Sequence, residues 1–227
     1  MPDIMIKARD GGTFSAYQAG SGGPGIVLIQ EIFGVNKVMR DLADGYAKQG
    51  YTVLCPDLFW RQEPGIQITD KTKAEWDKAF ALFNGFNQDK GIDDLTATLE
   101  HLRKMPGAAK AGCVGYCLGG RLAFMMAIRS DVDCAVSYYG VGLDGLVGEA
   151  NKIKKPVLLH IAEKDRFVPA EAQKKVREGL SGNKHVTMYF YPGQDHAFAR
   201  VGGEHYNKQA ADEANKRTAE FFKKNLG

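Results

Sequence analysis

The chain has 227 residues, of which 44% are apolar and 25% are charged. This length suits one domain with its own core, and this composition excludes collagen-like, low-complexity and wholly disordered chains. With 30 basic and 27 acidic side chains, the net charge of +3 is too small for the dense basic stripe of a nucleic-acid-binding protein.

Short apolar runs rich in β-branched residues alternate with helical patterns along the chain. We expect strands at residues 26–30, 51–55, 113–116, 134–138, 157–161 and 186–190, and helices at 37–48, 118–129, 169–180 and 207–226. This alternation predicts an α/β fold with a mostly parallel central sheet flanked by helices. Because no repeat or long linker divides the chain, we expect a single domain over residues 1–227.

Residues 62–106 have no strand pattern, and we expect two helices there, at about 70–84 and 90–104. Trp76, Phe80 and Phe83 recur at the i, i+4, i+7 spacing of one helix face. Two interpretations stay open. The aromatic side chains form a core stripe, or the segment is a partial helical cap whose aromatic side lines a pocket.

The strongest motif is Gly115-Tyr116-Cys117-Leu118-Gly119-Gly120, which fits Gly-x-Ser-x-Gly with cysteine as the central residue. A predicted strand precedes it and a predicted helix follows, as a nucleophile elbow requires. The helix N-terminus favours a thiolate and can offer the Leu118 N–H to an oxyanion. The alternative for Cys117 is a buried, inert thiol.

Two later loops can complete a catalytic triad. Asp165 follows the predicted strand at 157–161, and His196 follows the one at 186–190. The order Cys117, Asp165, His196 matches the nucleophile–acid–base order of α/β-hydrolases. Glu163 is a rival for the acid, and a helix cap or turn is the structural alternative for Asp165.

Three further expectations concern compartment and partners. The first residues lack a basic segment followed by an apolar one, and the longest apolar run is residues 122–128, so we expect neither a signal peptide nor a membrane partner. We expect a cytoplasmic monomer whose four cysteines are thiols. Because Cys113 and Cys117 have no second pair at metal-ligand spacing, we expect no metal and no other cofactor.

From about residue 25 to residue 225 the sequence resembles the dienelactone hydrolase family of α/β-hydrolases. The resemblance rests on Gln30-Glu31-Ile32-Phe33-Gly34, Cys55-Pro56-Asp57-Leu58, the elbow motif, the Asp165 loop and His196-Ala197-Phe198. It implies that a Cys117–His196–Asp165 triad opens lactones or esters through a thioester.

The resemblance also implies roles for residues that would otherwise read as ordinary loop or surface positions. The N–H groups of Ile32 and Leu118 would form the oxyanion hole, and Glu31 would meet the resting thiol and control thiolate formation. Arg200 falls where the family holds a substrate carboxylate, a task that suits a planar guanidinium.

The substrate end departs from the family pattern. The family's second carboxylate-binding Arg aligns with Trp76, a pocket Tyr aligns with Phe80, and a Ser of the type enzyme aligns with Ala197. The expected pocket is therefore more apolar.

We expect a hydrolase that opens an unsaturated lactone of the dienelactone type, or an ester. One alternative is the same chemistry on a more apolar ester or thioester. Another is a thiol-based binding or sensor protein without turnover.

Overall fold

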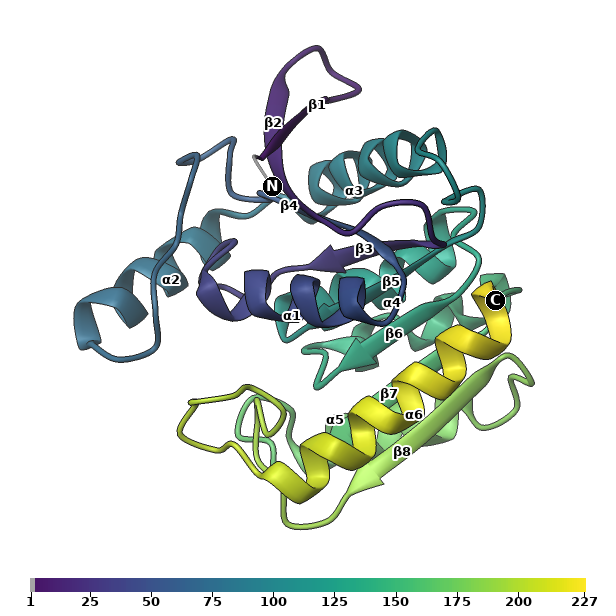
Figure 1. The fold of residues 1–227 in the computed structure, drawn as a ribbon. Helices are drawn as coiled ribbons and strands as arrows, with labels where there is room; N and C mark the ends of the chain where they lie inside the picture. The colour runs from purple at the N-terminus through teal and green to yellow at the C-terminus, as the bar shows by residue number, and fades with distance from the viewer. Residues whose placement is uncertain (1–2) are drawn as a thin grey trace. The chain divides into compact units, whose positions relative to one another are not determined.

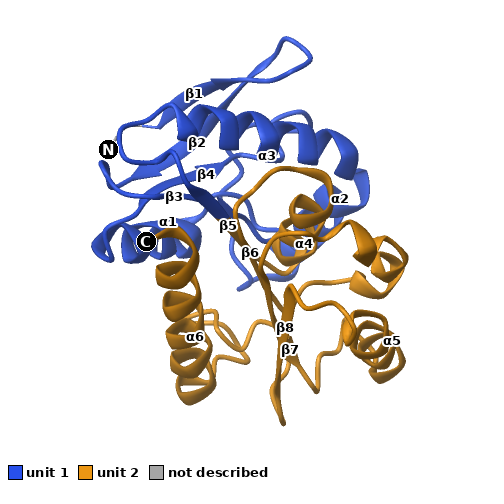
Figure 2. Cartoon of the chain, turned by 90° about the vertical axis from the view of Figure 1, so that its right-hand side faces the viewer, with its two compact units in different colours: residues 1–112 blue, residues 113–227 orange. Residues whose placement is uncertain are grey.

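The structure is a computed structural model that describes residues 3–227. Within these residues, eight strands and six α-helices form two compact units, which divide after Gly112 (Figure 2). Parallel strand pairs with flanking helices confirm the predicted α/β fold. The single domain expected over residues 1–227 stays a prediction.

The first unit contains strands and helices that are coloured purple to teal in Figure 1. They are β1 (Ile4–Lys7), β2 (Thr13–Ala19), β3 (Gly25–Ile29), α1 (Lys37–Lys48), β4 (Thr52–Pro56), α2 (Lys73–Gly85) and α3 (Gln88–Arg103). The strand order is β1-β2-β4-β3, with β3 and β4 parallel and the other two pairs antiparallel. All residues of β3 and β4 are buried, as expected for strands covered by helices on both faces.

The antiparallel strands β1 and β2 are absent from the sequence-based prediction. In β2 only Phe14, Ala16 and Ala19 are buried, and β1 buries Ile6 alone. Such short, half-exposed segments carry a weak apolar signal. The pairing of β2 with the buried strand β4 decides their conformation.

The helices of the first unit begin at side-chain caps. Asn36 caps α1 by accepting from the Met39 N–H, and Thr72 caps α2 by accepting from the Glu75 N–H. Helix α3 packs against β1, β3 and β4, so this part of residues 62–106 flanks the strands. Only α2 remains a candidate for the predicted cap.

The second unit contains the elements that carry the predicted triad. They are β5 (Ala111–Tyr116, from Cys113 on), α4 (Leu118–Arg129), β6 (Ala135–Tyr138), the short 3₁₀ helices η1 (Leu143–Gly145) and η2 (Val147–Lys152), β7 (Val157–Ala162), α5 (Ala170–Leu180), β8 (Val186–Tyr191) and α6 (Lys208–Leu226). Strands β5 to β8 are parallel and lie in sequence order. In Figure 2, α6 lies on one face of β7 and β8 and α5 lies on the other.

The register of these strands positions the loops that follow them. Tyr116 of β5 pairs with Tyr138 of β6, which pairs with His160 of β7, which pairs with Tyr189 of β8. Because all four strands are parallel, their carboxyl ends meet at one edge. The segments after β5, β7 and β8 therefore emerge together.

None of the helices in residues 3–227 is both long and apolar enough to span a bilayer.

Candidate active site

Cys117 occupies a strained turn between β5 and α4. Its φ of 57° and ψ of −116° lie in a region that residues with a side chain rarely occupy. Its N–H donates to the Tyr138 carbonyl at 3.1 Å. A Cβ on Gly115 would lie 1.9 Å from the Gly119 carbonyl oxygen, and one on Gly120 would lie 2.6 Å from the Tyr138 carbonyl oxygen. The flanking glycines are therefore a steric requirement of the elbow.

The four cysteines are free thiols that differ in environment. Burial raises the pKa of Cys55, Cys113 and Cys134 far above that of an ordinary thiol, whereas Cys117 is partly exposed. Cys117 also sits at the N-terminus of α4, whose first residue is the buried Leu118. The N–H groups of a first helical turn have no partner within the helix and favour a negative charge. Of the four thiols, Cys117 is thus the one that solvent can reach.

His196 and Asp165 form a buried pair. The Nδ1 of His196 lies 2.8 Å from Oδ2 of Asp165, and the side chains of both residues are at most 5% exposed. The other carboxylate oxygen accepts from the Phe167 N–H at 2.8 Å. Glu163, the rival acid, is exposed. The structure therefore pairs Asp165 with the histidine, and this bond fixes the ring orientation.

The charge on His196 follows from its neighbours. Burial alone would lower its pKa, but the thiolate form of Cys117 and the hydrogen bond with Asp165 outweigh burial and raise the pKa to about 10. Side-chain hydrogen bonding with Cys117 is a further cause of the raised pKa, so the sulfur and the imidazole are close neighbours.

Two aromatic rings pack edge-on against the imidazole. Phe167 lies 4.9 Å away at 82°, and Tyr139 lies 5.1 Å away at 63°. Phe167 is 42% exposed, so it presents an apolar edge to solvent beside the histidine. The sequence analysis identified neither residue. The only available signal was their position, directly after β6 for Tyr139 and two residues after Asp165 for Phe167.

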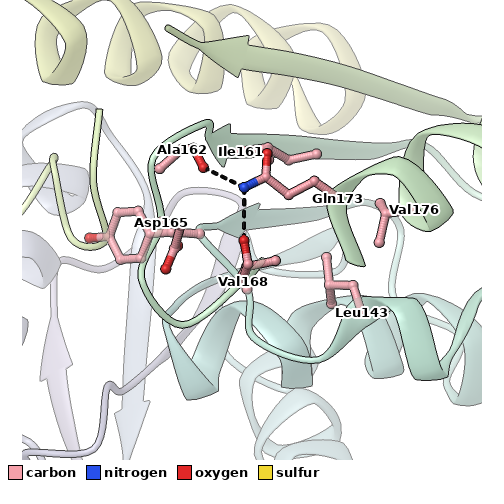
Figure 3. Close-up of a pocket in the computed structure, with 9 residues that line it drawn as sticks. Leu143, Ile161, Ala162, Asp165, Val168, Gln173 and Val176 are labelled. Carbon is pink, nitrogen blue, oxygen red and sulfur yellow. Dashed lines mark hydrogen bonds between the residues drawn. The ribbon is translucent and has the colours of Figure 1, made fainter. Parts of the chain in front are cut away.

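Gln173 of α5 stabilises the loop that carries Asp165 through side-chain hydrogen bonds. The Gln173 side-chain amide donates to the carbonyls of Val168 at 2.8 Å and Ala162 at 3.2 Å (Figure 3). These carbonyls lie on the two sides of Asp165 in the loop. Gln173 is buried and also lines the small cavity shown in that figure. It is a third residue that sequence reasoning missed.

Arg200 lies in the turn after His196 and is partly buried. Its N–H donates to the Ala197 carbonyl at 2.9 Å, and its carbonyl accepts from the Gly203 N–H at 3.0 Å. Ala197 has a positive φ of 62°. The structure thus places Arg200 in an ordered turn on the segment that carries the histidine.

Glu31 and Ile32 belong to the first unit, in a turn after β3, and both are buried. Gln30 holds this turn, because its side chain donates to the Glu31 carbonyl at 3.2 Å and accepts from the Leu58 N–H at 3.0 Å. The sequence analysis includes Gln30 in the family motif, and the structure adds that its buried amide holds this turn.

Trp76 and Phe80 also belong to the first unit, on α2. Their rings stack at 5.5 Å, and Phe33 meets Trp76 edge-on at 5.0 Å. The buried side of α2 is formed by Ala79 and Leu82, whereas Phe80 is 39% exposed. The interpretation of these aromatic residues as a core stripe is therefore wrong. They form a partly exposed aromatic surface.

Within residues 3–227, the side chains of histidine, cysteine, aspartate and glutamate form no group of three or more that could hold a metal ion.

Residues 12–226 match the model of the dienelactone hydrolase family. The chain belongs to the dienelactone hydrolase family. It is 59% identical, over the full length of both chains, to an Azospirillum brasilense protein provisionally named carboxymethylenebutenolidase. It is also 39% identical to the carboxymethylenebutenolidase of Pseudomonas putida, over 96% of this chain and 94% of that one. The protein is a hydrolase of this family, as the sequence resemblance implied.

Solved structures agree with the family assignment. A Klebsiella pneumoniae protein provisionally described as a dienelactone hydrolase superposes with a TM-score of 0.85 and 26% identity, over 98% of this chain and 97% of that one. A dienelactone hydrolase-like promiscuous phosphotriesterase from metagenomic libraries has a TM-score of 0.80 at 20% identity, over 100% and 99% of the two chains. The second likeness shows the shared fold alone.

Proposed function

We propose that this hydrolase opens an unsaturated lactone of the dienelactone type, or a related ester, with Cys117 as nucleophile. The observation that carries the proposal is the 2.8 Å bond between His196 and Asp165, on the segments after β8 and β7, together with the raised pKa of the same imidazole, to which Cys117 contributes. The names of the curated relatives, carboxymethylenebutenolidases, favour the lactone among possible substrates.

In the first half of the reaction, the Cys117 sulfur attacks the carbonyl carbon and the carbonyl oxygen becomes an oxyanion. The Leu118 N–H, at the start of α4, stabilises that charge. The bond between the carbonyl carbon and the ring oxygen then breaks, and His196 gives its proton to the departing oxygen. A thioester on Cys117 remains.

In the second half, His196 removes a proton from a water molecule that attacks the thioester carbon. The carbon–sulfur bond breaks and the acid leaves. Asp165 holds the imidazole and stabilises its charged form in both halves. An enolate leaving group is lost easily and re-attacks the thioester poorly. This property favours an unsaturated lactone over an ordinary alkyl ester.

Three further roles follow the family pattern and belong to the same proposal. The Ile32 N–H is the second oxyanion donor, and Glu31 meets the thiol form of Cys117 and so controls how much of it becomes the thiolate that acts on His196. Arg200 binds a substrate carboxylate, for which its forked guanidinium is suited.

A second substrate class has its own support in the aromatic surface of Trp76 and Phe80, against which the buried Phe33 packs. Phe80 is 39% exposed, and an apolar surface of this kind suits a substrate with a larger apolar part. The alternative function is the same cysteine chemistry on a more apolar ester or thioester.

The decisive experiment is steady-state hydrolysis of a carboxylated dienelactone beside p-nitrophenyl acetate, by the parent and by Cys117→Ala. Fast lactone opening that is lost in Cys117→Ala supports the main proposal. Turnover of the aryl ester alone, still dependent on Cys117, supports the alternative. Full activity in Cys117→Ala contradicts the mechanism, and acylation without turnover indicates a thiol-based binding or sensor protein.

The role of Arg200 has a separate test. Arg200→Ala should raise KM sharply for the carboxylated lactone and leave KM for the neutral p-nitrophenyl acetate unchanged. An unchanged KM for the lactone would remove Arg200 from the substrate site.

We also propose that the enzyme works as a monomer in the cytoplasm. Four free thiols in one chain suit a reducing compartment. Light scattering on the purified protein measures the oligomeric state, and a dimer mass would contradict the monomer.

A further inference from the structure

Asp195 directly precedes the histidine and makes four hydrogen bonds. Its Oδ1 accepts from the backbone N–H of Arg166 at 3.0 Å and from the backbone N–H of His196 at 2.6 Å. Its Oδ2 accepts from Nε of Arg166 at 3.1 Å and from Nη2 at 3.0 Å. One carboxylate therefore touches the residue after Asp165 and the catalytic histidine itself.

These contacts join the two loops that supply the triad. The Asp165 loop follows β7, and the His196 loop follows β8. The two loops share other backbone bonds, from Lys164 N–H to the Gln194 carbonyl at 2.8 Å and from Glu163 N–H to the Tyr191 carbonyl at 3.2 Å. Of these ties, only the Asp195 carboxylate reaches the backbone of His196.

Asp195 is charged at neutral pH. Partial burial would raise its pKa, but hydrogen bonds from Arg166 and from the His196 N–H outweigh burial and lower it. The His205 ring contacts the Arg166 guanidinium and lies 3.8 Å from Oδ2, at the outer edge of this cluster. A charged acceptor strengthens the two backbone bonds.

We propose that Asp195 is a positioning residue that clamps the His196 loop to the Asp165 loop. The clamp keeps His196 and Asp165 at hydrogen-bonding distance and orientation. The proposal rests on the proposed function, because the geometry being held is that of the proposed base and its acid. The two backbone bonds carry the effect. The guanidinium contributes little, since the Arg166 side chain is 48% exposed and exposed ion pairs are weak.

Two conservative variants separate geometry from charge. Asp195→Asn keeps an oxygen that can accept from both backbone N–H groups, so its kcat for p-nitrophenyl acetate should stay close to the parent value. Asp195→Glu keeps the charge but adds a methylene that displaces the oxygen. Its kcat should fall about 10- to 100-fold with KM unchanged, because displacement of a catalytic group by about 1 Å costs that much.

Glu149 offers a matched control. It is a carboxylate of the same unit that pairs with Arg129 and Lys152. Glu149→Ala should keep the parent kcat. Thermal unfolding of every variant shows whether the protein is folded at the assay temperature.

The NMR signal of His196 tests the clamp without substrate turnover. Its result therefore does not depend on the catalytic mechanism. The His196 Nδ1 proton, observed by NMR, should keep its resonance in Asp195→Asn and should shift or broaden in Asp195→Glu. A folded Asp195→Glu variant with the parent kcat and an unchanged His196 resonance overturns the proposal. So does an inactive Asp195→Asn beside an active Asp195→Glu, because the clamp would then act through charge. If Cys117→Ala is fully active, the proposed function fails, and the NMR result alone decides the clamp.

Discussion

Removal of the Cys117 sulfur should lower the pKa of His196. The size of the change measures how much the sulfur contributes to that pKa. In the parent, the ring has a pKa of about 10, against 6.5 for an ordinary histidine. Each pH unit corresponds to 1.36 kcal/mol, so the surroundings favour the imidazolium by on the order of 5 kcal/mol. Burial works against this preference, and the charges of Cys117 and Asp165 produce it.

In Cys117→Ala the ring loses the first of these charges, and only Asp165 opposes burial. An opposite charge at short range shifts a pKa by about 1–3 units, and the pKa of His196 should fall by a similar amount. A raised pKa means that the charged form persists to higher pH. The parent ring should therefore stay protonated through neutral pH, and the variant ring should lose its proton at lower pH.

NMR titration of the histidine ring protons measures the change, with His196→Gln used to assign the signal. His160 is an internal control on β7. It is buried, its nitrogens bond Tyr191 at 2.8 Å and Thr218 at 3.0 Å, and burial and Arg217 lower its pKa to about 3. It should remain neutral from pH 5 to pH 11 in both proteins.

Two results would refute the reasoning about charge. One is a parent His196 that titrates near 6.5. The other is an identical titration in the parent and in Cys117→Ala, because the sulfur would then carry no charge that acts on the ring.

Three further predictions concern stability and use chemical denaturation. Gly115→Ala should cost about 3 kcal/mol or more, because its Cβ would overlap a backbone oxygen, whereas Gly145→Ala, with open space around its Cβ, should change stability by less than about 1 kcal/mol. Gln173→Met keeps the side-chain size but leaves loop carbonyls without a donor, so it should cost about 1–3 kcal/mol, and no loss would show that water replaces the amide. Asp94→Ala should cost about 3 kcal/mol, because Asp94 is 1% exposed and accepts from Trp60 and Arg61, whereas the exposed Asp41 should tolerate alanine within about 0.5 kcal/mol.

Local sequence predicted the strands and the elbow, because the residues that produce them are close together in the chain. The apolar runs of β3, β5 and β7 are buried along their whole length, and such runs predict strands whatever their neighbours are. The glycines around Cys117 indicate a turn in which a Cβ at Gly115 or Gly120 would overlap the backbone. Chain order then suggested Asp165 and His196, because parallel strands bring their carboxyl ends to one edge.

Other features depend on contacts between distant segments, which no local pattern encodes. Glu163 and Asp165 are both acids in one loop, and only the fold buries Asp165 against His196 and leaves Glu163 exposed. Strands β1 and β2 are weak in isolation and exist because β2 pairs with β4.

The charge states of the histidines show the same division. His160 and His196 are both buried, so burial by itself does not separate their charge states. Tertiary structure surrounds His160 with hydroxyl groups and sets Asp165 and the charge of Cys117 to act on His196. The local pattern is enough to place acidic residues and histidines at the ends of the strands. Which of them carry a charge depends on the folded chain, because a pKa depends on neighbours that only folding brings within a few ångströms.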